Sequence, residues 1–538
     1  MQGGIHAAEI VMIILLLFVA VFAALARKLK TPYPIVLVVA GLLLSFVPGI
    51  PRIRLDPDIV FVVVLPPLLY SAAWLTSWRD FYYNLVSILL LAFGLVGFTV
   101  VGVAFIAHWL FPGFDWRLGV VLGAVVATTD SIAATAIAKQ IGLPRRIVDV
   151  LEGESLVNDA TGLLALEFGI SLMTGGGLPT VTAGFLRLAY LVVAGLGTGL
   201  IVAVIVDWFE RRIDDSRIEI TISILVPYAA YLAAESIHCS GVLAVVACGL
   251  YLSRRSAKFF SAGVRMRVMA VWNAITFILN GLVFVLIGLQ LHYVVSGIKN
   301  FGMGRLVLFG ALFSAVVIVL RLLWIFPGTY FSYFIRSRFL GQTHDRPSMS
   351  QIFVVGWTGM RGVIALAAAI SLPEMVNDGS PFPQRNIIIF LAFSVILVTL
   401  VLQGPTLPAV IRALGLAEGI RSTEEDDARR LMVQAALDHL QRQREEDHAD
   451  LAEIYDDLAG HYQHQLASLG GEDGREETSD LYSHFLEISR DLLGVERAKI
   501  ISLRDQGRIS DEVLRRLETE LDLNETRLLL AASGHADD

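Results

Sequence analysis

Polar and acidic side chains that can hold a small cation or a proton are concentrated in two otherwise apolar stretches of the sequence. They are Thr128, Thr129, Asp130 and Ser131 in residues 118–138, and Glu152, Glu154, Ser155, Asn158, Asp159 and Glu167 in residues 147–173. Hydroxyl and carboxylate oxygens ligate hard cations, and a carboxylate also takes up a proton. The two stretches together indicate a site that binds a cation or a proton.

The second stretch places its polar side chains on neighbouring faces of one helix. At about 100° per residue, Ser155 and Asp159 share one face, and Glu154 and Asn158 share the next. The alternative for any single carboxylate is a structural pair with a buried arginine. Only three basic residues fall inside apolar stretches, namely Arg187, Arg321 and Arg361. The carboxylates outnumber them, which favours a functional site.

The elements that must position these residues are membrane-spanning helices. The chain has 538 residues, of which 55% are hydrophobic and only 17% charged, and its mean hydropathy is +0.66. Soluble domains carry about a quarter of their residues as charged groups, so a soluble, a disordered or a collagen-like protein is excluded. The two cysteines, Cys239 and Cys248, are too few for a disulfide framework.

Thirteen segments meet or approach the roughly 20 apolar residues that a helix needs to cross a bilayer. They are residues 8–26, 33–49, 58–76, 82–110, 118–138, 147–173, 183–208, 218–236, 241–253, 271–290, 305–334, 350–372 and 386–412. The ninth segment is short and the fourth and eleventh are long, which leaves room for one helix more or fewer.

The distribution of basic residues predicts how these segments are oriented. Alternating the loops between the two sides puts 19 Lys and Arg on one side and six on the other. The side richer in Lys and Arg is normally cytoplasmic. We therefore expect a multi-pass protein of the plasma membrane with its amino terminus outside and its carboxyl-terminal tail in the cytoplasm.

Two of the segments contain helix-weakening residues. Residues 128–131 are four consecutive poor helix formers, and residues 356–362 include three glycines. These segments lie seven crossings apart, so they run in opposite directions through the bilayer. This is typical of an inverted repeat, here segments one to six and eight to thirteen, whose broken helices meet at the midplane. The alternative is that the glycines only allow close helix packing.

At these residues the sequence resembles the monovalent cation:proton antiporters of the Na+/H+ exchanger (NhaP-like) branch. The resemblance covers nearly all of the first 415 residues. Its motifs are Glu154-Ser155-Leu156-Val157-Asn158-Asp159 of segment six, Leu65-Pro66-Pro67-Leu68-Leu69 of segment three and Gly359-Met360-Arg361-Gly362 of segment twelve. One residue departs from the family pattern, since many relatives have Pro where Ser131 follows Asp130.

The resemblance implies an all-α membrane fold, a homodimer and a role for each site residue, with no cofactor. Asp159 and Asp130 would be the carboxylates that bind Na+, helped by the Ser155 hydroxyl and the Thr129 carbonyl. The supporting residues would be Glu154 and Arg321 as a buried pair, Asn158 orienting the site, and Arg361 offsetting charge at the helix crossing.

The chemistry of a buried carboxylate predicts the mechanism. Removal from water favours the protonated form, and a dehydrated cation supplies the same missing positive charge. Cation and proton therefore compete for Asp159, and alternating access turns this competition into exchange. Because Asn158 stands where a second acid would add another charge, we expect electroneutral one-for-one antiport. The oxygen ligands leave Na+, K+ and Li+ as alternatives.

Three other functions use features of this kind. An intramembrane aspartyl protease also uses two membrane-embedded aspartates, but Asp130 and Asp159 lie outside the Tyr-Asp and Gly-x-Gly-Asp motifs of that chemistry. A cation channel needs a continuous aqueous path in place of a competing proton site. A transporter of organic anions is disfavoured because acidic residues outnumber arginines within the apolar segments. Nucleic-acid binding is not expected, because the sequence contains no basic segment that would form a basic surface.

The last part of the chain differs in composition from the rest. From residue 421 onward it carries 14 basic and 29 acidic residues. We therefore expect a transmembrane domain over residues 1–415 and an acidic, helical, cytoplasmic tail over residues 416–538. Apolar periodicity predicts helices over 451–469, over about 478–506 and from Ser510 or Asp511 onward. A helical bundle is the simplest interpretation; six histidines suggest the alternative of pH regulation.

Overall fold

The computed structural model describes most of the chain as helix. It describes residues 2–29, 31–47, 57–111, 113–174, 181–213, 215–296, 298, 302–342, 346–376, 379–417, 423–446, 452–468, 475–506, 508 and 511–533. Over these residues no strand forms, and one isolated bridge joins Met375 to Pro381. The chain divides into two compact units, Met1–Ala417 and Glu418–Asp538.

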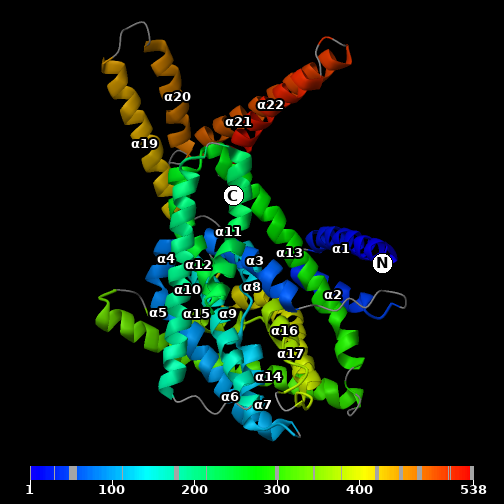
Figure 1. Ribbon diagram of the computed structural model, residues 1–538. Helices are drawn as coiled ribbons and strands as arrows, with labels where there is room; N and C mark the ends of the chain where they lie inside the picture. Colours follow the sequence, from blue (N-terminus) through cyan, green and yellow to red (C-terminus); the bar gives the residue numbers. More distant parts are fainter. Residues whose placement is uncertain are drawn as a thin grey trace. The chain divides into compact units, whose positions relative to one another are not determined.

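The first unit is built from α-helices interrupted by three short π-helical stretches (Figure 1). In chain order they are α1 (Gln2–Lys28), α2 (Tyr33–Leu44), η1 (Ile59–Val64), α3 (Leu65–Leu75), α4 (Trp78–Tyr83), α5 (Leu85–Leu89), η2 (Leu90–Leu95), α6 (Val96–Leu110), α7 (Trp116–Ala127), α8 (Ser131–Ile141), α9 (Arg145–Met173), α10 (Val181–Glu210), α11 (Ser216–Ser236), α12 (Gly241–Phe259), α13 (Ala262–Ser296), α14 (Met303–Phe339), α15 (Met349–Trp357), α16 (Val363–Ile370), α17 (Arg385–Val398), η3 (Thr399–Gln403) and α18 (Gly404–Ala413).

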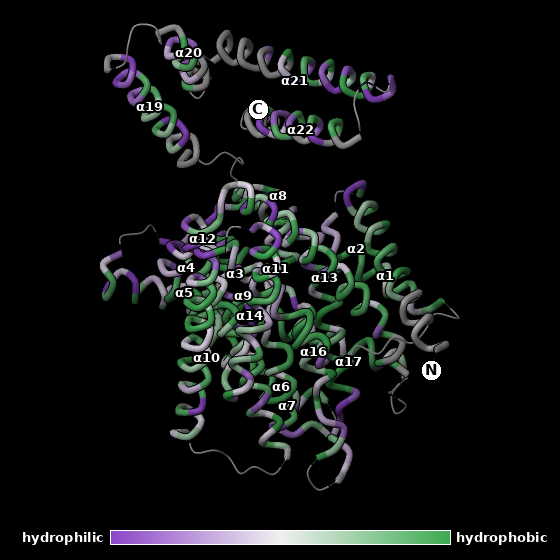
Figure 2. The backbone as a smooth tube through the Cα atoms, turned by 45° about the horizontal axis from the view of Figure 1, so that its top comes forward, coloured by the Kyte–Doolittle hydropathy of each residue, from purple (hydrophilic) through white to green (hydrophobic). Residues whose placement is uncertain are grey.

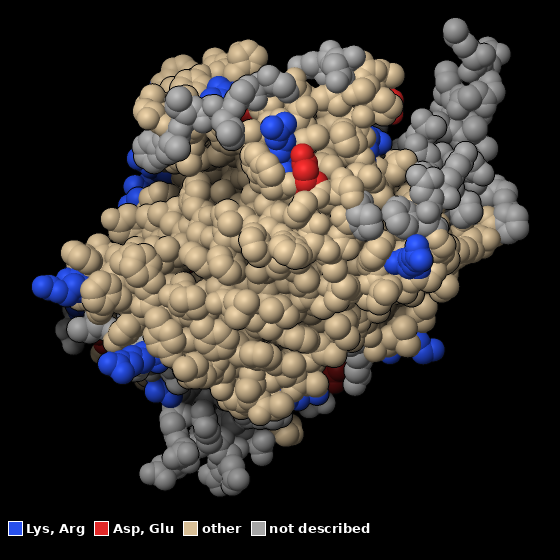
Figure 3. Space-filling view, turned by 90° about the horizontal axis from the view of Figure 1, so that it is seen from below, with Lys and Arg blue, Asp and Glu red and all other residues tan. Residues whose placement is uncertain are grey.

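The helices of this unit have the length and composition of membrane spans. Among the described residues, eight helical stretches are long and apolar enough to cross a bilayer, and α2 and the η1–α3 stretch are shorter apolar helices. Large hydrophobic side chains point outward, including Val193 and Ile201 of α10, which are 70% and 63% exposed. Hydrophobic residues follow most of these helices in Figure 2, and the face in Figure 3 is largely uncharged. An apolar exterior suits lipid.

Two of the three π-helical stretches end two residues before a proline. η1 is followed by Leu65-Pro66-Pro67 and η3 by Gly404-Pro405. Proline has no backbone N–H and its ring collides with the carbonyl one turn earlier, so the preceding turn widens. Segments three and thirteen are thus continuous helices with a local change of winding.

Close glycine contacts set the spacing of several helix pairs. A Cβ at Gly41 of α2 would lie 2.5 Å from the carbonyl oxygen of Val285 in α13, and one at Gly288 would lie 2.4 Å from the carbonyl oxygen of Val38. Only glycine lets the two backbones approach this closely. Helices α2 and α13 form one wall of the cavity described below.

The second unit consists of four helices, α19 (Thr423–Glu446), α20 (Ala452–Ser468), α21 (Arg475–Asp505) and α22 (Asp511–Ser533). The last three lie within a few residues of the ranges expected from apolar periodicity, whereas α19 was not predicted. Arg497 of α21 pairs with Asp522 and Glu525 of α22, at 2.7 Å each. Of the six tail histidines, only the exposed His439 and His484 have described side chains.

Candidate functional site

The two segments with helix-weakening residues are both broken, and the breaks cross each other. Helix α7 stops at Ala127 and α8 begins at Ser131, while α15 stops at Trp357 and α16 begins at Val363. The Asp130 amide donates a 2.9 Å hydrogen bond to the Met360 carbonyl. The four half-helices therefore end around one shared point.

Gly362 allows this crossing. A Cβ at this position would lie 2.0 Å from a carboxylate oxygen of Asp130 and 2.5 Å from its Cβ. Any larger residue would therefore push the two broken segments apart, so the glycine has a packing role in addition to weakening the helix.

Arg361 lies fully inside the crossing, with 1% of its surface exposed. Its guanidinium donates to the carbonyls of Val126, at 2.6 Å, and Gly359, at 2.8 Å. Val126 is in the last turn of α7, where unpaired carbonyls make the end of a helix partly negative. A buried cation at this place compensates both half-helix ends and makes no ion pair with a described carboxylate.

Glu154 and Arg321 form a buried ion pair between α9 and α14. The two Arg321–Glu154 contacts are 2.5 and 2.9 Å long, and the side chains of Arg321 and Glu154 are 2% and 1% exposed. Arg321 also donates to the carbonyls of Gly356, at 3.2 Å, and Val355, at 3.1 Å. The pair thus ties α9 and α14 to the last turn of α15.

Thr129 connects this pair to the break in segment five. Its hydroxyl donates to Glu154 at 3.1 Å and accepts a short hydrogen bond from the Asn158 amide. Its carbonyl accepts a 2.8 Å hydrogen bond from the Ser155 hydroxyl. Three residues of α9, Glu154, Ser155 and Asn158, therefore hold the unwound backbone at Thr129 against that helix.

Asp130 has a second role that the sequence analysis did not predict. One of its carboxylate oxygens accepts a 2.9 Å hydrogen bond from the Ile132 amide. An acidic residue directly before a helix commonly accepts such a bond from the first turn. One oxygen therefore caps α8, and the other lies beside Gly362.

Asp159 differs from Glu154, Arg321 and Arg361 because, within the described part of the chain, neither an ion pair nor a carbonyl contact balances its charge. The residue is 3% exposed, and its Oδ1 atom has no hydrogen-bond partner. Among the described residues it forms no ion pair, because Arg321 is engaged by Glu154 and Arg361 by carbonyl oxygens. An unpaired buried carboxylate is costly unless a proton or a cation accompanies it.

A cavity of about 320 Å³ reaches the site. Asp130, Asp159, Thr129 and Ser155 line it, together with Thr128, Ser131, Thr135 and Glu152. Its opposite wall comes from η1, α3 and the helices α2 and α13, which contribute Tyr33, Thr276 and Asn280. An ion can therefore approach the carboxylates through a space that contains both polar and apolar side chains.

Sequence reasoning missed the polar residues of that opposite wall. Asn280 is 2% exposed and its Oδ1 atom has no hydrogen-bond partner. The sequence indicates this wall only through two polar residues, Asn280 and Thr276, within the apolar segment 271–290. They carry no formal charge, and only the packing of α13 against α2 places them across from Asp130.

A buried carboxylate at the crossing of two broken helices, within a helical membrane protein, is the arrangement of a secondary transporter. The chain belongs to the sodium/hydrogen exchanger family, whose transmembrane model matches residues 13–413. The members of this family are transporters that exchange Na+ for H+, not enzymes.

Known proteins of the same family resemble the chain in sequence and fold. An uncharacterized Na(+)/H(+) exchanger of Mycobacterium tuberculosis is 34% identical, with 98% of this chain and 97% of the relative covered. A sodium, potassium, lithium and rubidium/H(+) antiporter of Bacillus pumilus is 32% identical over 78% of this chain and 64% of its own length. The sodium proton antiporter MjNhaP1 of Methanocaldococcus jannaschii shares the fold, with a TM-score of 0.61 at 18% identity, over 77% of this chain and 100% of its own.

The buried ion pair leads to a prediction about stability. Glu154→Gln leaves Arg321 charged and unpaired, which costs about 3–5 kcal/mol. We expect a large loss of folded protein in fluorescence-detected chromatography and a lower midpoint of thermal unfolding. The double variant Glu154→Gln/Arg321→Gln should recover part of both, because it removes both charges.

The matched control lies on the same helix. Glu167 pairs with Arg187 at 3.3 Å, and these side chains are 58% and 39% exposed. Packed helices do not enclose this pair, so we expect Glu167→Gln to retain more folded protein than Glu154→Gln. Equal losses in the Glu154→Gln and Glu167→Gln variants, or strictly additive losses in the double-mutant cycle, would contradict the structural role of the buried pair.

Proposed function

We propose that this protein exchanges Na+ for H+ across the membrane by letting the two compete for Asp159. The observation that carries the proposal is the unpartnered carboxylate oxygen of Asp159 in a cavity where every nearby buried arginine is already engaged. The carboxylate must take up a positive charge from the cavity. A proton and a dehydrated cation both supply it, and each excludes the other.

Four residues supply the oxygens of the proposed cation site. Asp159 provides the unpaired oxygen, and Asp130 provides the oxygen that does not cap α8. The Ser155 hydroxyl and the Thr129 carbonyl, now 2.8 Å apart, share one hydrogen bond. The Ser155 oxygen also accepts a 3.3 Å hydrogen bond from the Ser131 amide. Turning the O–H away from Thr129 therefore frees the Thr129 carbonyl and leaves the second lone pair of the Ser155 oxygen for a cation.

Four further residues hold this site in place in the proposed mechanism. Asn158 and Glu154 position Thr129 through its hydroxyl, and Arg321 keeps Glu154 neutralised. Arg361 stabilises the two half-helix ends. Because Arg321 neutralises Glu154 and carbonyl oxygens hold Arg361, a positive charge that enters the cavity interacts chiefly with Asp159 and Asp130.

The cavity supports access from the side predicted to be cytoplasmic. Besides the two aspartates, it is lined by Tyr33 at the start of α2, Leu75 at the end of α3 and Glu152 in the first half of α9. These helix ends adjoin the loops that carry the larger number of basic residues. The proposal assigns this conformation to the inward-facing state, with the amino terminus outside and the tail in the cytoplasm.

The remaining architecture of the proposal follows the family resemblance. We infer thirteen crossings in an inverted six-helix repeat, with α7–α8 and α15–α16 as the repeat-related broken helices. We also infer a homodimer in the plasma membrane, a part in pH homeostasis, and a soluble regulatory domain formed by α19 to α22. The acidic, helical composition of that unit supports its assignment as a tail outside the bilayer.

K+ or Li+ is the alternative cargo. The relative from Bacillus pumilus is named as an antiporter of sodium, potassium, lithium and rubidium. Hydroxyl, carbonyl and carboxylate oxygens suit all these ions, so the size of the space between Asp159 and Asp130 determines the selectivity. Exchange measured separately with Na+, K+ and Li+ assigns the cargo.

The central variant is Asp159→Asn. An amide takes up neither a proton nor the charge of a cation, so we expect cation-dependent proton movement in vesicles to fall to background. Folded protein should be retained, because the change removes a buried unpaired charge. The control is Glu167→Gln, which removes a carboxylate from the exposed face of the same helix. Robust exchange by Asp159→Asn would remove Asp159 from the mechanism.

Stoichiometry gives a second prediction. Because Asn158 stands beside Asp159 where a second acid would add another charge, we expect one proton to be exchanged for one cation. In proteoliposomes, the final Na+ gradient should be unaffected when a gradient of a membrane-permeant anion such as thiocyanate imposes a membrane potential of either sign. A gradient that changes with the potential would show that net charge moves.

A further inference from the structure

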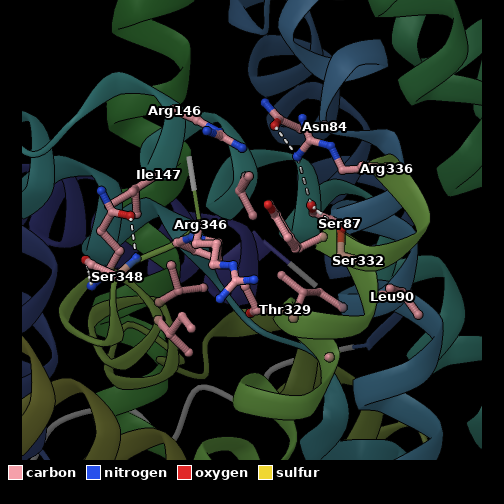
Figure 4. A pocket seen from close by; sticks show the side chains of 18 of the residues that line it. Asn84, Ser87, Leu90, Arg146, Ile147, Thr329, Ser332, Arg336, Arg346 and Ser348 are labelled. Atoms are coloured by element: carbon pink, nitrogen blue, oxygen red, sulfur yellow. Dashed lines mark hydrogen bonds between the residues drawn. The ribbon is translucent and has the colours of Figure 1, made fainter. Parts of the chain in front are cut away.

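A second cavity of the first unit has a volume of about 350 Å³. The ends of α5, α9 and α14, the start of α15 and the residues before α15 form its walls. It shares no lining residue with the cavity around Asp159. Figure 4 shows three arginines, Arg146, Arg336 and Arg346, arranged around this space.

Arg336 is the buried member of this group, with 5% of its surface exposed. Its Nε donates to Gln342 at 2.8 Å, and its Nη1 lies 3.4 Å from both Asn84 and Ser87. Its Nη2 has no hydrogen-bond partner, and its guanidinium lies 4.8 Å from the Tyr83 ring centroid. All of these neighbours are neutral, so the buried positive charge is held without a described carboxylate.

The charged residues that line this cavity, among those described, are all basic. Its described residues include three arginines and no Asp or Glu. Hydroxyl and amide groups surround the arginines, namely Asn84, Ser87, Thr329, Ser332, Tyr333, Gln342, Ser348 and Gln351. Arg346 is exposed. Arg146 also interacts with other groups of the protein. Such a lining disfavours a cation and attracts an anion with several oxygens.

We propose that this cavity binds a phosphate group carried by an amphiphilic or a soluble molecule. The planar guanidinium presents paired donors that match phosphate oxygens, and the unpartnered Nη2 of Arg336 is such a donor inside the cavity. The inner wall is apolar, formed by Leu90, Ile147, Val150 and Val355. Basic cavities between helices on the cytoplasmic side of a membrane protein are suited to anionic headgroups.

The position of the cavity connects a bound phosphate to the broken helix α15. Ser348 and Gln351 form the capping box at the start of α15 and also line the cavity. Val355, on the inner wall, accepts a hydrogen bond from Arg321 of the buried pair. Occupancy therefore stabilises the cytoplasmic half of segment twelve, so ligand binding should be visible as thermal stabilisation.

The test measures binding to the purified full-length protein in detergent. The midpoint of thermal unfolding is followed while dioleoyl phosphatidic acid, zwitterionic dioleoyl phosphatidylcholine or inorganic phosphate is titrated. We expect phosphatidic acid or inorganic phosphate to raise the midpoint and phosphatidylcholine to leave it unchanged. Arg336→Gln and Arg346→Gln should each weaken the apparent affinity about tenfold, which corresponds to about 1.4 kcal/mol.

Arg338→Gln is the matched control, because Arg338 lies on the same turn of α14, is exposed and does not line the cavity. Stabilisation by phosphatidic acid alone identifies a lipid headgroup, and equal stabilisation by inorganic phosphate identifies a soluble phosphate compound. Arg346→Gln decides the outcome if the buried Arg336 variant does not fold. No stabilisation by either probe, or equal weakening by Arg338→Gln, would overturn the proposal.

Discussion

The structure depends on leaving one buried carboxylate without a positive partner. Two arginines lie at the crossing of the broken helices, and among the described residues neither forms an ion pair with Asp159. Arg321 is instead held by both oxygens of Glu154, and Arg361 is held by the carbonyls of Val126 and Gly359. In the proposed mechanism, these contacts leave the charge of Asp159 for an ion from the cavity.

The same arrangement explains why the helices are broken. In a continuous helix the backbone carbonyls are hydrogen-bonded within the helix, so none of them is available to an ion. Unwinding at residues 128–130 turns the Thr129 carbonyl toward Ser155, and unwinding at residues 358–362 exposes the Met360 carbonyl to Asp130. Gly362 then allows the two segments to meet, since a Cβ there would collide with Asp130. Gly359 leaves room for the Arg321 side chain of α14. The same unwound residues thus expose backbone carbonyls to polar partners and allow the two segments to cross.

Local sequence features predicted the parts of this site that depend on neighbours along the chain. Runs of hydroxyl residues and glycines predicted both breaks, and helical spacing put Ser155 and Asp159 on one face. The association of Glu154 with Arg321 came from the family resemblance, because 167 residues separate them. Asn280, Thr276 and Tyr33 were missed, since only the packing of α2 and α13 brings them to the cavity. The phosphate cavity was missed for the same reason: its arginines come from three separate segments.

The most direct test of the account is to count the protons released when Na+ binds to the purified protein in weakly buffered detergent solution. Competition for Asp159 predicts that each bound Na+ displaces one proton, recorded by a pH-indicator dye, and that the release disappears in Asp159→Asn. Binding of Na+ to the unmodified protein without proton release would contradict the claim that one buried carboxylate serves both ions in turn.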